Sequence, residues 1–226
     1  MSNIYLFREQ AHEISKLRNL KFIHITKTAG TSLEKSAKRE NIHWGKFHEE
    51  LKATCLKAKS WWHCPLSSHS KKLQEKYDWF LVCRNPYERI ISEFHCKWGG
   101  VGKKSKYFTI TMFNLYVIFK ILRFQHLERV FNVFQPHYQK QSLYLEGPAR
   151  KFIIRFEFLD SDLKKLAGLY ADVEKILPLK KLNVNQKKFT TKNFWALTIY
   201  LIRIIYKNDF NNFGYSTEAN TPKLKV

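Results

Sequence analysis

The stretch KFIHITKTAGTSLEKSAKR occupies residues 21–39 and joins two patterns at a short loop. Residues 21–25 are mostly β-branched or aromatic, which indicates a buried strand, and the end of the stretch consists of helix formers. Small residues in the loop let backbone N–H groups approach an anion, and Lys27, Thr31 and Ser32 add side-chain donors beside a helix N-terminus. The pattern therefore predicts a phosphate-sized cradle made of Thr26, Lys27, Thr28, Ala29, Gly30, Thr31 and Ser32.

This loop differs from a Walker A loop. The pattern GxxxxGK[ST] places its Lys after two glycines, whereas Lys27 precedes Gly30, the only glycine of the loop. An ordinary strand-to-helix turn with a solvent-exposed Lys27 is the alternative interpretation of the loop by itself.

A second unit of the same kind begins with WFLVC at residues 79–83. Asn85 suits the N-cap of a following helix, and Pro86 suits its first position. A third strand is predicted over KFIIRFEFL at 151–159, ahead of another helical pattern. Strands that alternate with helices predict an α/β fold with a central parallel sheet flanked by helices, whose ligands bind beyond the carboxyl ends of the strands.

The rest of the chain reads as helical. Residues 107–146 are mainly helical in pattern, and 190–210 predict a helical C-terminal part. Their most apolar segments, 107–119 and 194–202, are too short to span a bilayer, and we expect buried helices there. The chain length predicts a single domain over 1–226.

Both ends of the chain carry weaker signals. Residues 1–19 read as an N-terminal extension and 217–226 as a flexible tail. The first twenty residues resemble neither a signal peptide nor a membrane anchor, so the sequence as given predicts a cytoplasmic protein. The Golgi lumen or another compartment stays open for a chain trimmed of an anchor.

The net charge indicates the class of partner, and the cysteines indicate whether a metal site or disulfides are expected. The sequence has 40 Lys and Arg against 19 Asp and Glu, a formal net charge of +21, which predicts anionic partners. The alternative explanation of this charge is that Lys-rich faces are simply solvated.

The four cysteines Cys55, Cys64, Cys83 and Cys96 do not have the spacing of metal ligands. We therefore expect no metal site and free thiols, with Cys83 in the core. Two disulfides are the alternative for an extracellular domain.

The segment that follows the second strand carries a further phosphate-binding pattern. Arg84 leaves the strand end, and Arg89 and Ser92 are three residues apart on the predicted helix, so they share one face. A guanidinium and a hydroxyl suit a phosphate group. For Arg89 alone, a surface ion pair is the alternative.

Taken together, the two segments resemble a known enzyme family. KFIHITKTAGTSL is similar to the 5′-phosphosulfate loop ("hIPKTAGTSL") of the sulfotransferases that use 3′-phosphoadenosine 5′-phosphosulfate (PAPS), and FLVCRNPYERIISEF is similar to their 3′-phosphate motif ("VRNPxxRxxS"). Their order and their separation of roughly fifty residues also match. The carbohydrate-type branch, with its Golgi-type and bacterial relatives, is the most similar.

Weaker similarities extend over most of the chain, and two positions depart from the family pattern. The weaker matches are WWHCP at 61–65, HYQKQSLYL at 137–145, IIRFEFLDSDL at 153–163 and YKNDFNNFGYS at 206–216. Thr26 stands where the family has Pro before the Lys, which affects loop stiffness. Lys140 replaces the Pro of a family "PQ" pair, which leaves the acceptor side less well aligned.

The resemblance implies a P-loop-NTPase-like fold and a role for each matching residue. Lys27 would contact the bridging and 5′-phosphate oxygens, and Arg84 and Ser92 would hold the 3′-phosphate with Arg89 as a helper. The 5′-phosphate would be held by Thr28, Ala29, Gly30, Thr31 and Ser32. PAPS would be the donor, 3′-phosphoadenosine 5′-phosphate (PAP) the product, and no metal is required. Transfer to an in-line acceptor needs positioning, charge neutralisation and a base.

The base and the acceptor are less closely defined. Among the His and acidic residues between the two motifs we choose His63, because WWHCP resembles a His-x-Pro segment of relatives in which an acceptor-facing His occurs. The other candidates are His69, His48, Glu49, Glu50 and His43. Trp61 and Trp62, the turn at 97–100 and the basic run at 103–106 are candidates for a carbohydrate-acceptor cleft, with core packing and a solvated loop as the alternatives.

Two other functions fit parts of the pattern. A small-molecule kinase on a P-loop architecture would need ATP with Mg²⁺, and the missing Walker A order weighs against it. A non-catalytic module that binds polyanions would use the net charge and would respond steeply to salt. The chain contains no known nucleic-acid-binding motif, and the oligomeric state is left open.

Overall fold

A computed structural model describes residues 4–6, 17–54, 61–131, 136–179 and 187–219. The chain divides into two compact units, each made of two segments: unit 1 comprises 1–83 and 143–183, and unit 2 comprises 84–142 and 184–226. The expectation of a single domain stays a prediction.

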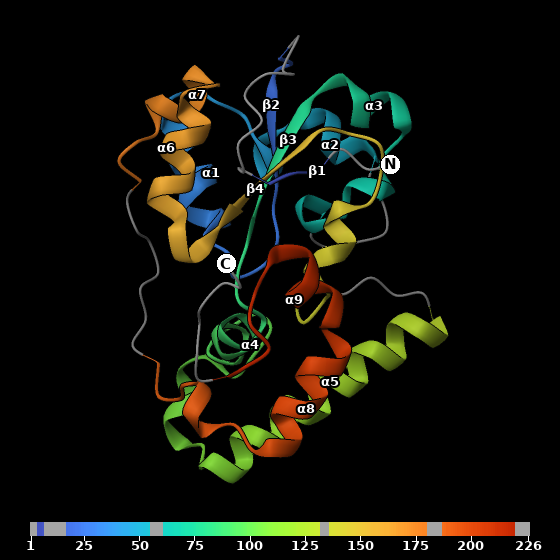
Figure 1. Cartoon of the computed structure of the whole chain (residues 1–226), viewed down its shortest axis with the longest axis vertical. Coiled ribbons are helices and arrows are strands. Elements are labelled where there is room, and N and C mark those ends of the chain that lie inside the picture. The colour runs from blue at the N-terminus through green and yellow to red at the C-terminus, as the bar shows by residue number, and fades with distance from the viewer. Residues whose placement is uncertain (1–3, 7–16, 55–60, 132–135, 180–186, 220–226) are drawn as a thin grey trace. The chain divides into compact units, whose positions relative to one another are not determined.

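Unit 1 contains the strands and the helices that surround them (Figure 1). Its strands are β1 (Ile4–Leu6), β2 (Leu20–Ile23), β3 (Asp78–Cys83) and β4 (Lys151–Arg155). Its α-helices are α1 (Gly30–Arg39), α2 (Glu49–Thr54), α3 (Lys71–Lys76), α6 (Leu159–Ala167) and α7 (Ala171–Lys175). Its short 3-10 turns are η1 (Gly45–Phe47), η2 (Trp61–His63), η3 (Leu66–Ser68) and η6 (Phe156–Phe158).

The described strands form one parallel sheet in the order β1-β4-β3-β2. Phe22 of β2 pairs with Phe80 of β3, which pairs in turn with Phe152 of β4. The predicted α/β fold with a parallel sheet flanked by helices is therefore confirmed. Part of the predicted N-terminal extension is β1, which pairs with β4 at the sheet edge.

Helices cover both faces of this sheet (Figure 1). Every residue of β3 is buried, as expected for a central parallel strand. On one face, alternate strand residues pack against helices α1, α6 and α7. The strand residues include Phe22, Phe80, Val82, Phe152 and Ile154, and the helix residues include Leu33, Leu163 and Val173. On the other face, the indole N–H of Trp79 donates to the carbonyl of Gln74 in α3 at 2.9 Å. The ends of β2 and β3 are thus held side by side by a packed core.

The third strand is shorter than predicted. β4 ends at Arg155, and residues 156–158 form η6, so the predicted strand over 151–159 is wrong beyond Arg155. Arg155 makes a forked contact with Asp162 of α6: Nε lies 2.9 Å from Oδ2 and Nη2 lies 3.0 Å from Oδ1. The same carboxylate accepts the backbone N–H of Arg155 at 3.1 Å. This contact ends the strand, because it uses the donor that a further strand pair would need.

Unit 2 is helical. It contains α4 (Pro86–Phe94), η4 (Gly102–Tyr107), α5 (Ile110–Phe131), η7 (Thr191–Asn193), α8 (Ala196–Ile205) and α9 (Lys207–Phe213), and η5 (Gln141–Leu145) runs across the boundary with unit 1. Asn85 caps α4 as predicted, since its Oδ1 accepts the N–H of Tyr87 at 3.0 Å, and Pro86 occupies the first position. The helical C-terminal part is also confirmed.

The two apolar helices of unit 2 pack together through a polar residue. Asn114 of α5 accepts from the hydroxyl of Thr198 at 2.7 Å and from the N–H of Trp195 at 2.8 Å. The expectation that both helices are buried is wrong, because α5 and α8 each expose several large apolar side chains. No helix in the described part of the chain has the length and apolarity needed to cross a bilayer.

The cysteines differ from one another. Cys83 is a buried free thiol at the end of β3, and Cys96 is a half-buried free thiol, as predicted. Cys64 takes part in a disulfide, so the expectation of a free thiol is wrong there. Cys55 and the predicted flexible tail beyond residue 219 lie outside the described residues.

Candidate active site

The loop between β2 and α1 has an unusual backbone. Lys27 and Ala29 both adopt left-handed conformations, with φ of 63° and 70°. Each such non-glycine residue costs about 1–2 kcal/mol, so the surrounding contacts must hold the loop in this shape. One such contact is made by the buried hydroxyl of Thr28, which donates to the carbonyl of Ile25 at 2.9 Å. The hydroxyl of Thr28 therefore stabilises the loop.

Helix α1 begins at Gly30, immediately after this loop. Its first turn contains no acidic residue, so the positive end of the helix dipole is not offset there by a carboxylate of that turn. Lys27 and Ala29 are partly exposed and Thr31 is exposed, whereas Gly30 and Ser32 are buried. The loop thus presents one ammonium group, one accessible hydroxyl and backbone N–H donors, which is the donor set of an anion site.

A buried His-Glu pair supports the loop from behind. Nδ1 of His24 lies 3.3 Å from Oε1 of Glu34, which also accepts the backbone N–H of Lys46 at 2.8 Å. The His24 ring lies directly against Gly30, since a Cβ at residue 30 would be 2.2 Å from its Cδ2 and Nε2 atoms. Only glycine fits at this position without displacing the ring. His24 and Glu34 were not predicted as site residues, because nothing in their spacing indicates that the loop folds them together.

The predicted base joins the same group. Nδ1 of His63 lies 2.8 Å from the carbonyl oxygen of His24, and the two rings meet edge to face at 4.5 Å. A carbonyl oxygen only accepts, so Nδ1 is the donor and the neutral ring carries its lone pair on Nε2. The hydroxyl of Tyr144 donates to the carbonyl of His63 at 3.0 Å. The structure therefore places His63 beside His24 with its Nδ1 as the hydrogen-bond donor, and its role as the base stays a prediction.

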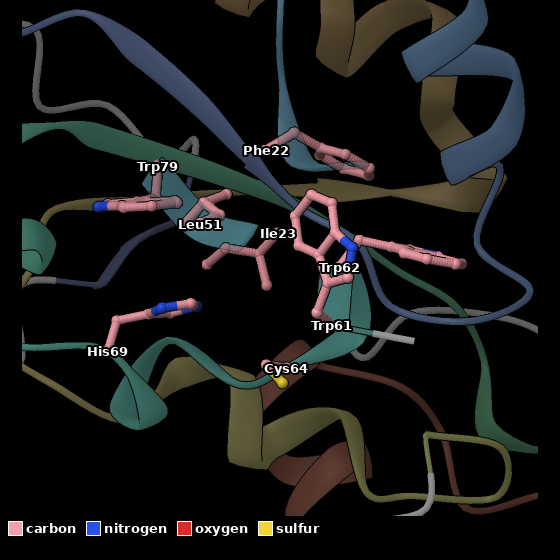
Figure 2. Close-up of a pocket in the computed structure, with 8 residues that line it drawn as sticks. All are labelled: Phe22, Ile23, Leu51, Trp61, Trp62, Cys64, His69 and Trp79. Atoms are coloured by element: carbon pink, nitrogen blue, oxygen red, sulfur yellow. The ribbon is translucent and has the colours of Figure 1, made fainter. Parts of the chain in front are cut away.

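Trp61, Trp62 and Trp79 help to line a small cavity (Figure 2). Its volume is about 10 Å³, enough for roughly one water molecule. The residues that line it are Phe22, Ile23, Leu51, Trp61, Trp62, Cys64, His69 and Trp79. This space is too small for a sugar. Trp61 and Trp62 are nevertheless only half-buried, and Nζ of Lys46 lies 4.6 Å from the ring centre of Trp62.

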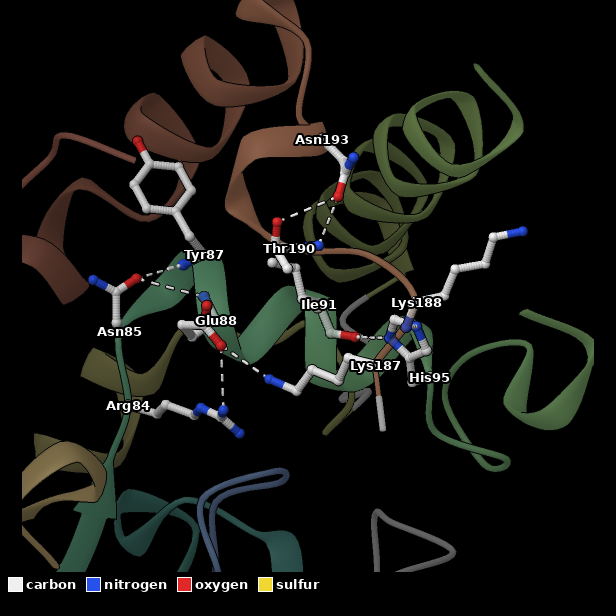
Figure 3. Close-up of polar contacts among 10 residues, drawn as sticks. All are labelled: Arg84, Asn85, Tyr87, Glu88, Ile91, His95, Lys187, Lys188, Thr190 and Asn193. Atoms are coloured by element: carbon white, nitrogen blue, oxygen red, sulfur yellow. Dashed lines mark hydrogen bonds and ion pairs between the residues drawn. The ribbon is translucent and has the colours of Figure 1, made fainter. Parts of the chain in front are cut away.

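Arg84, the residue after β3, begins unit 2. Its Nη2 lies 3.4 Å from Oε2 of Glu88, and Nζ of Lys187 reaches the same oxygen at 2.9 Å (Figure 3). Two cations therefore share the carboxylate of Glu88. Figure 3 also shows Asn85 capping α4 beside them.

The peptide group of Arg84 is held on both sides by one side chain. The Oε1 atom of Gln141 accepts the N–H of Arg84 at 2.9 Å, and its Nε2 donates to the carbonyl of Arg84 at 2.8 Å. The buried carboxylate of Asp209 in turn accepts the backbone N–H groups of Gln141 and Ser142, both at 2.8 Å. Two segments that resembled the family only weakly, 137–145 and 206–216, thus have a clear function, which is to fix the backbone at Arg84.

Arg89 has a different environment from the one expected. It is only 2% exposed, and its guanidinium donates to the backbone carbonyls of Gln139 at 2.6 Å and Pro136 at 3.4 Å. Arg89 therefore contacts the backbone of residues 136–139, and its role as a helper at the 3′-phosphate stays a prediction. Ser92 lies one turn further along α4 and is half-buried.

The comparison with protein families covers most of the chain. A family model described as the sulfotransferase family matches residues 13–216. This chain belongs to the sulfotransferase family. The resemblance carried by the two loops is confirmed, and with it a P-loop-like α/β fold and the transfer of sulfuryl groups. The comparisons with curated proteins and with solved structures found no significant match.

The other candidate bases of this sulfotransferase are less suitable. Burial lowers the pKa of His48 to about 4, with the charge of Lys21 as the next cause, so His48 binds protons weakly near neutrality. Burial also lowers the pKa of His69, which lines the small cavity. Glu49 and His43 are exposed. Glu50 is exposed too and bonds to Lys76 at 2.7 Å.

The sulfotransferase shows no metal cluster in the ranges that the structure describes, where no three His, Cys, Asp or Glu side chains are grouped to hold an ion. The structure brings Gly30, His24, Glu34 and His63 together within unit 1, at the loop that also carries Lys27. It brings Arg84, Gln141 and Asp209 together within unit 2. The joint use of the two groups in one binding site stays a prediction.

Proposed function

We propose that this sulfotransferase uses PAPS as its donor and transfers the sulfuryl group to a hydroxyl or amine of a carbohydrate-like or small-molecule acceptor. The loop after β2 is the observation that carries the proposal. Its left-handed residues Lys27 and Ala29, and a helix start free of acidic residues, provide the donors that the 5′-phosphosulfate end of PAPS needs.

The second end of PAPS is the 3′-phosphate, and the sheet supports a site for it. Strand β3 lies directly beside β2, and Arg84 is the residue that follows the last residue of β3. We assign the 3′-phosphate to Arg84 and Ser92, with Lys187 as an additional cation. Glu88 would then exchange part of its contact with these cations for the phosphate. A nucleotide without a 3′-phosphate would lack this contact, which favours PAPS over ATP.

When bound, PAPS supplies an activated sulfuryl group whose bond to the 5′-phosphate oxygen breaks as a bond to the acceptor forms. The ammonium group of Lys27 would offset the negative charge that develops on the leaving oxygen. Nε2 of His63 would take the proton of the acceptor, since its Nδ1 is committed to the carbonyl of His24. Glu34 and His24 would hold this arrangement in place.

The half-buried Trp61 and Trp62 support a carbohydrate-like acceptor. The rings of Trp62 and His63 are 5.5 Å apart, and an aromatic face next to a base suits the apolar face of a sugar. The disulfide at Cys64 favours an oxidising compartment, such as the Golgi lumen, over the cytoplasm.

Titration calorimetry with PAP tests the donor assignment. We expect the wild-type protein to bind PAP without a metal and more tightly than ATP with Mg²⁺. Lys27→Ala and Arg84→Ala should each weaken PAP by about tenfold or more, because each removes a charge-assisted contact. The exposed residues Lys35 and Arg39 of α1 supply matched controls, and Lys35→Ala and Arg39→Ala should bind as the wild type does. Preference for ATP, or equal loss in the controls, would contradict the proposal.

Transfer of labelled sulfate from PAPS to a panel of acceptors tests the role of His63. His63→Ala should lower kcat by about 100-fold or more while PAP affinity is retained. The exposed His43 provides the control, and His43→Ala should leave kcat unchanged. A His63→Ala variant with wild-type kcat would exclude His63 as the base and direct attention to Glu49 or His69.

A further inference from the structure

Helix α5 of unit 2 has an apolar stripe on its outer face. Met112, Leu115, Phe119 and Leu122 recur at i, i+3, i+7 and i+10, so they line one side of the helix, and each is between 46% and 55% exposed. The opposite side, formed by Phe113, Val117 and Ile121, is completely buried. A helix on the surface of a globular protein normally carries polar residues on its outer face. The stripe is therefore exposed apolar surface rather than part of the core.

The chain around the stripe is strongly basic. Residues 94–127 contain no Asp or Glu and carry five Lys and one Arg. Lys103, Lys104 and Lys106 are exposed in η4, immediately before α5. Cations also lie over exposed rings: Nζ of Lys106 is 4.8 Å from the ring centre of Tyr107, and the guanidinium carbon of Arg123 is 5.8 Å from that of Phe119. Apolar side chains and cations are thus interleaved along η4 and α5.

Among the side chains that the structure describes, the most exposed aromatic ones occur in the same part of unit 2. Trp98 is 78% exposed and Tyr107 is 71% exposed, and Nζ of Lys97 lies 4.6 Å from the ring centre of Trp98. Trp and Tyr are favoured at the boundary between water and lipid, where an apolar ring and a polar group are both accommodated. Lys and Arg beside them can extend to anionic headgroups while their stems cover apolar surface.

We propose that η4 and the outer face of α5, together called the α5 face, bind the surface of an anionic lipid bilayer. Met112, Leu115, Phe119 and Leu122 would enter the boundary between headgroups and acyl chains, and the cations would contact the headgroups. A second copy of this chain is a less suitable partner, because it would bring the same cations and a net charge of +21 to the interface. The lysines at 103–106 are thereby assigned to lipid rather than to the acceptor. The proposal is independent of the donor and acceptor of the enzyme.

Vesicle sedimentation with the full chain tests the α5 face. Wild-type protein should bind vesicles of phosphatidylcholine with phosphatidylserine and should bind pure phosphatidylcholine vesicles weakly. The double variant Leu115→Gln/Phe119→Gln keeps the net charge and should lower partitioning by at least about tenfold, because it removes apolar area from the buried face. Met112→Gln/Leu122→Gln is a second variant of the same stripe. Phe158→Gln is the control, since Phe158 is 43% exposed but belongs to unit 1.

Two triple variants distinguish the effect of the cations in η4 on vesicle binding from the effect of the net charge of the protein. Lys103→Gln/Lys104→Gln/Lys106→Gln should weaken binding to anionic vesicles, whereas Lys71→Gln/Lys72→Gln/Lys164→Gln removes the same charge from exposed sites of unit 1 and should have a smaller effect. Equal effects of these two triple variants, or wild-type binding by both stripe variants, would overturn the proposal. So would a wild-type dimer in sedimentation velocity that the stripe variants dissociate, in the absence of vesicle binding.

Discussion

The contact between Gly30 and His24 gives a sharp test of how the anion loop is built. In Gly30→Ala the new Cβ would lie 2.2 Å from Cδ2 and Nε2 of His24 and 2.9 Å from its Cε1. Real Cβ contacts are longer, so either the ring or the first turn of α1 must move. The ring has little freedom, because its Nδ1 faces Glu34 at 3.3 Å and its edge meets the His63 ring.

Overpacking of this kind costs about 1–3 kcal/mol of unfolding free energy. For a chain of this size, that corresponds to a decrease in Tm of about 2–10 °C. We expect urea unfolding followed by tryptophan fluorescence to show this loss, and calorimetry to show weaker PAP binding, because displacement of His24 distorts the loop. Gly168→Ala is the matched control in the same unit. Its Cβ would meet the carbonyl of Lys165 at 3.4 Å, an ordinary contact, so stability should change by less than about 0.5 kcal/mol.

A double-mutant cycle identifies the clash as the cause. In a His24→Ala background the space beside residue 30 is empty, and Gly30→Ala should then cost at least about 1 kcal/mol less than in the wild type. The reasoning is refuted if Gly30→Ala costs the same in both backgrounds, or if it behaves like Gly168→Ala.

Three further substitutions test other parts of the molecule. The pKa of His48 is lowered from 6.5 to about 4, so the folded state binds fewer protons than the unfolded state in that window, and stability is lost as pH falls from 6.5 to 4. The loss of unfolding free energy is up to about 3 kcal/mol. Urea unfolding at several pH values should show this loss in the wild type and not in His48→Gln. The same dependence of stability on pH in both proteins would contradict the prediction. Asp209→Leu leaves two N–H groups without their acceptor and should lose about 3 kcal/mol and weaken PAP binding, whereas the exposed Asn208→Ala should do neither. Arg89→Met should lower the unfolding free energy by about 3 kcal/mol, whereas Arg39→Met, at an exposed position, should not. Equal stability of these two variants would show that the contacts of Arg89 with backbone carbonyls do not stabilise the fold.

Local patterns predicted the parts of the fold that depend on near neighbours. The strands at β2 and β3 and the N-cap at Asn85 involve residues a few positions apart, and all were found. The third strand was extended too far, because its end depends on Asp162, which reaches back across seven residues to Arg155. The apolar composition of α5 predicted burial on all sides, but composition does not specify which face of a helix has a partner.

The candidate site shows the same division between local and distant information. Lys27, Arg84 and the loops that carry them are visible in the sequence, because loop conformation and helix starts follow from adjacent residues. The support of the loop by His24 and Glu34, the tautomer of His63, and the clamp of Arg84 by Gln141 and Asp209 were decided by the tertiary structure alone. These contacts join residues from 10 to 68 positions apart, and only a packed core fixes such distances. The sequence by itself predicted which groups would meet an anion, and the fold decided which groups hold those residues in place, because such contacts form only between distant segments in a packed core.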